Sequence, residues 1–226
     1  DCLLQDKLTN ALNMPISDLA KLKEIQPFLD LAEMLGQIQF QIAKGPISHI
    51  SIECYGTADE IKPIARACIK GLLQSQVAER INYILAESIA QELGLEIDIH
   101  YSTVKSSYIN LISTKVTINK TVYKLDGSVF DDHRPRLVNI LGREMEVTPR
   151  GTLLLVENND VPGVIGNVGT LLGNLNINIA AYLLNRTGEK GKAFAVIRVD
   201  NRLSNDDLNK LFEIQDIKSV NQIHLS

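Results

Sequence analysis

Residues 152–180 read TLLLVENNDVPGVIGNVGTLLGNLNINIA, and this stretch decides the fold of the second half of the chain. Its first five residues form an almost continuous apolar run, which predicts a strand at the centre of a sheet. Pro162 and Gly163 then open a segment whose apolar residues repeat at helical spacing. The side chains expected to face inward are those of Val164, Ile165, Val168, Leu171, Leu172 and Leu175. A second strand is predicted from Ile177 to the region of Leu183.

The rest of the second half continues the same alternation. A third strand is predicted over 193–199, and Ser204 and Asp207 form a capping pair that opens a second helix. A last strand covers 217–225. The order is therefore βαββαβ, the ferredoxin-like arrangement, for a domain that we place at residues 151–226.

The first half predicts a different domain, of the α+β class, over residues 17–150. From Ser17 the apolar residues step by three and four, which is typical of a helix. Pro27 interrupts this pattern, so we expect one short helix ending near Gln26 and a second running from Pro27 to about Ala43. The segment 1–16 is too short to form a hydrophobic core of its own, and we expect it to be the tail of a preceding domain.

Downstream of these helices, the pattern predicts mostly antiparallel strands. Residues 50–55 alternate between apolar and polar, and Thr57 to Glu60 has the spacing of a capping box for the next helix. Two hairpins are predicted further on. The first turns at Asn119-Lys120 and the second at Gly142-Arg143.

Composition narrows the classes of function. The 226 residues carry a net charge of −4, with no Trp and only 5% aromatic residues, which argues against a nucleic-acid partner. No apolar run is long enough to span a membrane and no secretory leader is apparent, so a soluble, cytoplasmic protein is expected. The three Cys and four His are scattered without metal-ligand spacing, so no metal site is predicted.

The glycines that follow the strand at 152–156 invite comparison with a phosphate-binding loop. Their spacing does not fit the dinucleotide fingerprint, and no Gly-Lys-Ser/Thr is present, so neither NAD nor a nucleotide is expected to bind here. The interpretation we favour is structural. Gly166, Gly169 and Gly173 would let the helix lie close to its sheet.

Polar residues around the same loop suggest a receptor for a free amino acid. A helix N-terminus offers unpaired N–H groups, so the backbone of Val161, Pro162 and Gly163 is a candidate site for a carboxylate. Asp160 would bind an ammonium group or cap the helix. Asn178 would bind both groups if a second chain or the first loop brought it close. The residues alone leave open that they are merely turn and cap residues.

Two resemblances extend this reading to the whole chain. Residues 158–180 resemble an ACT domain, a βαββαβ regulatory module that binds amino acids between paired domains. Residues 17–150 resemble the intervening, or allosteric substrate-binding, domain of the long-form D-3-phosphoglycerate dehydrogenase family. The motifs that carry this second likeness are 10–15 (NALNMP), 31–36 (LAEMLG), 70–73 (KGLL) and Gly142-Arg143.

The resemblance implies a regulatory part of a longer enzyme. That enzyme would oxidise 3-phosphoglycerate with NAD in the first step of L-serine synthesis, while its catalytic and NAD-binding residues would precede this chain. L-serine would bind at Asn158 and Asp160 of one ACT domain and at Asn178 of its partner. The resemblance implies a dimer through these domains, and a tetramer for the whole enzyme. Asn158 departs from the His or Tyr common in the family.

The resemblance also implies that the first domain binds phosphate or a substrate anion. The candidate residues are Arg134, Arg136 and Arg143. Neighbouring carboxylates would oppose an anion, so the alternative that these are solvated surface charges stays open. Two other functions stay open. One is the regulatory part of an iron–sulfur L-serine dehydratase, and the other is a purely structural dimerisation module.

Overall fold

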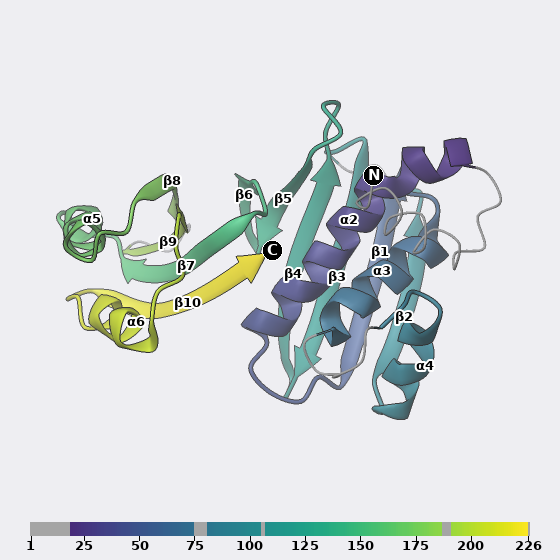
Figure 1. The fold of residues 1–226 in the computed structure, drawn as a ribbon, viewed down its shortest axis with the longest axis horizontal. Coiled ribbons are helices and arrows are strands. Elements are labelled where there is room, and N and C mark those ends of the chain that lie inside the picture. Colours follow the sequence, from purple (N-terminus) through teal and green to yellow (C-terminus); the bar gives the residue numbers. More distant parts are fainter. Residues whose placement is uncertain (1–18, 75–80, 105–106, 187–190, 226) are drawn as a thin grey trace, which may run out of the picture. The chain divides into compact units, whose positions relative to one another are not determined.

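The computed structural model describes residues 19–74, 81–104, 107–186 and 191–225. The chain divides into two compact units, Asp1–Gly142 and Arg143–Ser226 (Figure 1). The division falls before β6 (Arg143–Val147), which we had placed in the first domain. Residues 1–16, expected to be the tail of another domain, lie outside the described residues.

The first unit is an α+β fold, as predicted. Its elements are α2 (Leu19–Ile42), β1 (His49–Gly56), α3 (Ile61–Leu73), α4 (Leu85–Glu92), β2 (Glu96–Ser102), β3 (Asn110–Ile118), β4 (Thr121–Val129) and β5 (Pro135–Ile140). The strand order in this unit is β2-β1-β3-β4-β5. The pairing of β1 with β2 is parallel, and those of β1 with β3, β3 with β4 and β4 with β5 are antiparallel. Helices α2 and α3 cover one face of this sheet (Figure 1).

Helix α2 is continuous, so the expected break at Pro27 is wrong. Proline removes one helical hydrogen bond and crowds the preceding turn. Here the apolar stripe keeps its spacing through the proline, since Ile25 and Leu29 are both buried on one side of α2. Packing of this stripe offsets the local cost and holds the two halves in one helix.

Helices α2 and α3 touch through their backbones. A Cβ atom added to Gly36 would lie 2.0 Å from the carbonyl oxygen of Cys68, and one added to Gly71 would lie 2.0 Å from the carbonyl oxygen of Glu33. Beside this contact, the Lys70 ammonium lies 2.8 Å from the Glu33 carboxylate, which also accepts a hydrogen bond from Tyr83 at 3.1 Å. The two glycines therefore set the spacing of the helix pair.

The capping box predicted from Thr57 to Glu60 does not form. Helix α3 starts at Ile61, and its N-cap Glu60 makes no side-chain hydrogen bond to the helix. The Glu60 carboxylate instead pairs with Lys21 of α2. A charge-assisted contact with another element thus replaces the local one.

Both predicted hairpins form, but one of them turns a residue earlier than expected. Asn119 and Lys120 have φ values of 46° and 70°, as a tight turn between β3 and β4 requires. In the second hairpin the residues with positive φ are Leu141 (54°) and Gly142 (84°). Arg143 is therefore the first residue of β6 and not part of the turn.

Two cysteines lie in the core of the first unit, and we expect them to be unreactive in the folded protein. Cys54 and Cys68 are fully buried. Burial, and then the charge of Glu53, raises the pKa of the Cys54 thiol to about 12, and burial also raises the pKa of Cys68. Because the thiolate is the reactive form, a thiol reagent at pH 8 should label neither residue until denaturant is added. Peptide mass spectrometry would show this, and rapid native labelling of Cys54 would contradict it.

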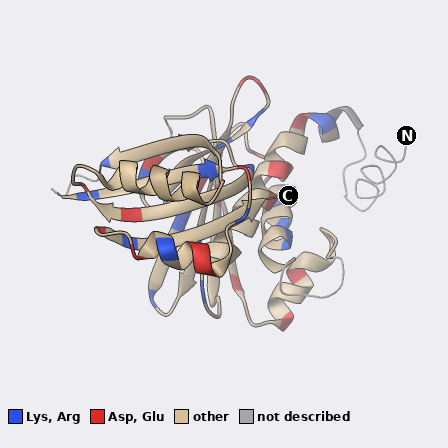
Figure 2. Ribbon diagram, turned by 60° about the vertical axis from the view of Figure 1, so that its left-hand side comes forward, with Lys and Arg blue, Asp and Glu red and all other residues tan. Residues whose placement is uncertain are grey.

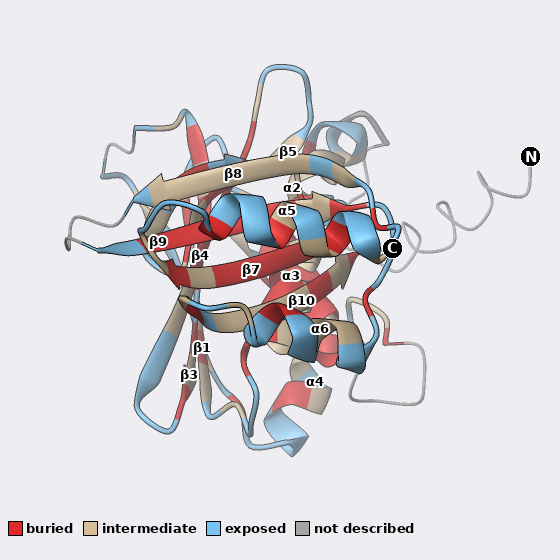
Figure 3. Cartoon of the chain, turned by 90° about the vertical axis from the view of Figure 1, so that its left-hand side faces the viewer, coloured by how far each residue is buried: buried red, intermediate tan, exposed pale blue. Residues whose placement is uncertain are grey.

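The second unit has the predicted ferredoxin-like arrangement. After β6 come β7 (Gly151–Asn159), α5 (Val164–Asn174), β8 (Ile179–Arg186), β9 (Lys192–Val199), α6 (Asn205–Phe212) and β10 (Ile217–Leu225). The strand order is β10-β7-β9-β8, and all three pairings are antiparallel. Figure 3 shows α5 and α6 across the same face of this sheet. Of these helices, α6 carries both acidic and basic residues while α5 carries none (Figure 2).

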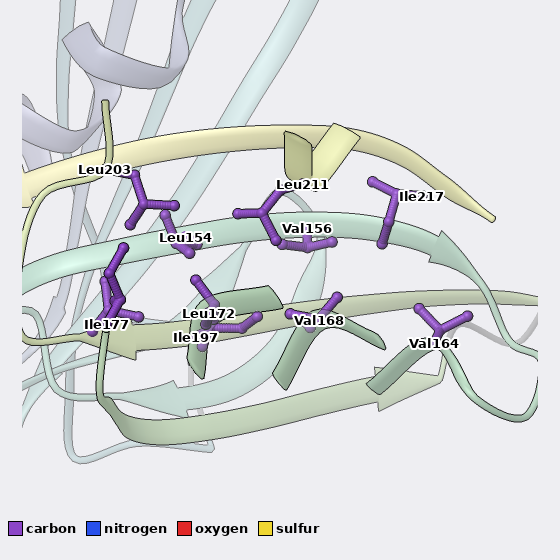
Figure 4. Packing of buried hydrophobic residues seen from close by; sticks show 12 residues of the cluster. Leu154, Val156, Val164, Val168, Leu172, Ile177, Ile197, Leu203, Leu211 and Ile217 are labelled. Carbon is purple, nitrogen blue, oxygen red and sulfur yellow. The ribbon is translucent and has the colours of Figure 1, made fainter. Parts of the chain in front are cut away.

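The core of the second unit lies between these helices and the sheet (Figure 4). From α5 it takes Val164, Val168 and Leu172, as the spacing predicted. Ile165, also expected to face inward, is 50% exposed. The buried stripe of α5 is thus narrower than predicted.

The glycines of α5 do not have the role that we predicted for them. A Cβ atom added to Gly166, Gly169 or Gly173 would meet no described atom within 4 Å. They therefore do not bring the helix closer to its own sheet. Their side of α5 is open to solvent within this chain.

Candidate functional site

A cavity of about 210 Å³ opens at the N-terminal end of α5. It is lined by Asn158, Asp160, Val161, Pro162, Gly163, Val164, Ile165, Leu184 and Arg186. The sequence-predicted residues from the end of β7 and the loop after it therefore all line one cavity. The C-terminal end of β8 supplies Leu184 and Arg186, which sequence reasoning missed.

The loop before α5 is shaped by its own backbone hydrogen bonds. Asp160 donates its N–H to the carbonyl of Gly191 at 3.0 Å, and Val161 donates to Asn159 at 3.0 Å. Gly163, the N-cap residue, has a φ of 97°, where a side chain would be strained. The first turn of α5 thereby presents N–H groups without helical partners to the cavity.

Asn158, one of the residues that line this cavity, has an unsatisfied acceptor. The residue is 5% exposed, and its side chain donates from Nδ2 to the Asn159 carbonyl at 2.6 Å. The Oδ1 atom is buried and has no hydrogen-bond partner among the described residues. An unmet buried acceptor costs about 1–3 kcal/mol, so a donor from a ligand would be stabilising here.

Asp160 and Arg186 form an ion pair at the rim of the cavity. The Nε atom of Arg186 lies 3.2 Å from Oδ2 of Asp160, and their side chains are 75% and 28% exposed respectively. Such an exposed pair is weak, about 0–1 kcal/mol. A bound ligand can therefore displace it at small cost.

The sheet register explains why Arg186 reaches this cavity. Arg186 on β8 and Asn158 on β7 are both opposite Ala193 of the intervening strand β9. Residues in such a row point to one face of the sheet, and the outer two are roughly 10 Å apart. Ala193, the residue between them, is small and buried.

Asn178, the third predicted serine ligand, lies elsewhere within the chain. It directly precedes β8, beyond the C-terminal end of α5, and donates from Nδ2 to Asp200 at 3.0 Å. The chain by itself does not bring Asn178 to Asn158 and Asp160. This agrees with the expectation that Asn178 would act from a second chain, which stays untested.

The three arginines proposed for an anion all have acidic partners. Arg134 and Arg136 both approach Oδ2 of Asp132, at 3.6 and 3.4 Å. Arg143 donates to Glu157 at 2.6 Å, and its guanidinium lies 4.5 Å from the ring centre of Phe194. Arg143 is therefore used within the second unit, rather than displayed at a turn.

No group of three or more His, Cys, Asp or Glu side chains in the described part of the chain is arranged to hold a metal ion. Within the same residues, no helix has the length and apolar character needed to cross a membrane.

Comparison with known proteins assigns the first unit to a family. The model of the D-3-phosphoglycerate dehydrogenase intervening domain matches residues 24–141, just over half of the chain. The chain therefore belongs to the D-3-phosphoglycerate dehydrogenase intervening domain family. The match ends almost where the first unit ends.

Relatives extend the similarity to both units. D-3-phosphoglycerate dehydrogenases of Bacillus subtilis and Methanocaldococcus jannaschii are 29% and 30% identical to this chain over 96% of its residues. The D-3-phosphoglycerate dehydrogenase of Synechocystis is 28% identical over 100% of this chain. The chain spans about two fifths of the length of these relatives: 42% of the Bacillus subtilis enzyme and 41% of each of the other two.

One solved structure, the ACT domain from GTP pyrophosphokinase of Chlorobium tepidum, aligns with 33% of the chain and 97% of its own length. It is 15% identical to the chain, with a TM-score of 0.28.

Proposed function

We propose that this chain is the regulatory part of a D-3-phosphoglycerate dehydrogenase and binds L-serine at the N-terminus of α5. The observation that carries the proposal is that Asn158, whose buried Oδ1 has no hydrogen-bond partner among the described residues, lines the same cavity as Asp160. Together they offer two acceptors for an ammonium group. The N–H groups of the first turn of α5 offer donors for a carboxylate.

The activity of the longer enzyme is part of this proposal. It would oxidise 3-phosphoglycerate with NAD, using residues that are not in this chain, and serine would be the end product that controls it. Serine could act only by binding one arrangement of the regulatory domains better than another.

The pairing of two copies through the ferredoxin-like unit is also proposed. Strand β8 is an edge of the four-stranded sheet, so one side of its backbone has no partner strand among the described residues. Light scattering at high micromolar concentration should give at least a dimer. A monomeric mass would contradict the pairing.

The serine site predicts two binding defects. Asp160→Ala should weaken L-serine at least tenfold, because it removes a charge-assisted contact worth about 1.5–3 kcal/mol. Asn178→Ala should weaken serine similarly and leave the oligomer mass unchanged. Calorimetric titration of serine into the whole chain measures both effects.

The matched control for Asp160→Ala is Asp206→Ala, which removes an exposed carboxylate of α6 that does not line the cavity. This variant should bind serine like the wild type. If the wild type binds serine and neither Asp160→Ala nor Asn178→Ala weakens it, the site is elsewhere. If the wild type forms dimers but binds no serine at millimolar concentration, the remaining function is that of a purely structural dimerisation module.

An anion site in the first unit remains a smaller part of the proposal. Arg134 and Arg136 converge on Asp132, so a phosphate would have to displace this carboxylate. Loss of phosphate binding in Arg136→Gln, measured by titration, would support that site. Unchanged binding would exclude this residue.

A further inference from the structure

The loop before α5 offers the cavity fewer backbone donors than the sequence predicted. Of Val161, Pro162 and Gly163, the first already donates its N–H to Asn159, and proline has none. Among these three residues only Gly163 keeps an N–H for a ligand. The remaining backbone donors come from the first turn of α5, so a carboxylate that needs several donors would be incompletely bound by the loop itself.

Arg186 is placed to supply the missing donors. It lines the cavity, and its side chain is 75% exposed, so it can move. Its register position puts it across Ala193 from Asn158, on the same face of the sheet. A guanidinium can donate two parallel hydrogen bonds to one carboxylate.

We propose that Arg186 binds the carboxylate of the amino acid and so makes the cavity selective for zwitterions. The proposal rests on the function proposed above. Within the chain, Asp160 and Arg186 neutralise each other at 3.2 Å. A zwitterion inserts its ammonium against Asp160 and its carboxylate against Arg186, so every charge stays paired. A simple amine or a simple carboxylic acid would leave one of the two side chains without its partner.

The test compares L-serine with L-serinamide, which keeps the ammonium and hydroxyl groups but has no carboxylate. Both are titrated calorimetrically into the whole chain, as wild type and as Arg186→Gln. The wild type should bind serine at least tenfold more tightly than serinamide. Arg186→Gln should weaken serine at least tenfold and shift serinamide less than twofold, so that the preference between them disappears. Arg186→Lys should recover part of the serine affinity.

Two controls separate this role from a general loss of charge or fold. Arg202→Gln removes another exposed cation of the same unit and should leave both affinities unchanged. Asp160→Ala should weaken both ligands, because both carry the ammonium. If Arg186→Gln binds serine as tightly as the wild type, the role of Arg186 is disproved while the serine site stands. A wild type that does not bind serine would instead remove the proposed function itself.

Discussion

Gly36→Ala should destabilise the first unit by about 3 kcal/mol, the upper end of the usual cost of overpacking. The new methyl group would lie 2.0 Å from the carbonyl oxygen of Cys68 and 2.6 Å from the amide nitrogen of Leu72. Both are backbone atoms, so neither can rotate away and the two helices must separate. Urea unfolding followed by circular dichroism gives the loss. Hydrogen exchange should place it in α2 and α3.

Gly169→Ala is the matched control, since it makes the same change inside a helix. Its methyl group would meet no described atom within 4 Å. Alanine is about 1 kcal/mol better than glycine inside a helix, so this variant should gain stability. Wild-type stability in Gly36→Ala would contradict the close approach of α2 and α3.

Phe194→Ala should destabilise the second unit by about 3–5 kcal/mol. Phe194 is 1% exposed on β9, and deletion of a buried aromatic side chain leaves a cavity. Its ring also holds the guanidinium of Arg143, 4.5 Å from the ring centre, so that contact would be lost as well. Hydrogen exchange should show reduced protection in β7 and β9 but not in β1 and β3.

Phe194→Leu serves as the milder comparison, because it keeps most of the apolar volume and loses only the aromatic contact. It should cost clearly less than the alanine variant. Equal losses in the two variants would mean that the contact with Arg143, rather than packing, dominates at this position.

Local sequence signals predicted most elements because the causes of those elements are local. The cap at Ser204 is an example, since its Oγ accepts the N–H of Asp207 at 3.2 Å as expected. The predictions failed where contacts with residues distant in the sequence determined the local structure. Glu60 pairs with Lys21 of another helix, and the burial of Ile25 and Leu29 keeps α2 whole through its proline.

The predicted position of the second hairpin turn was wrong for a different reason. Leucine rarely adopts a positive φ, so the sequence pointed to Gly142 as the first turn residue. Pairing of β4 with β5 imposes the observed position, and Leu141 donates its N–H to the carbonyl of Lys124 at 2.8 Å. Register thus overrides the preference of a single residue.

The residues of the candidate site show the same difference between local and distant causes. Asn158 and Asp160 could be predicted because they lie next to the start of α5 in the sequence. Arg186 comes from another strand, and only the pairing of β8 with β9 and of β9 with β7 brings it there. Residues that are neighbours across a sheet cannot be identified from a single sequence until the register of the strands is known.

The length of α5 has a consequence for any serine site that uses Asp160 and Asn178 together. The helix has 11 residues and so separates its two ends by about 16 Å. One small amino acid cannot bridge that span, so such a site must be assembled from two chains. By mass action, serine would then tighten the association of the chains, and dilution of the protein would lower its apparent affinity for serine. The working protein concentration would thereby become a regulatory variable in its own right.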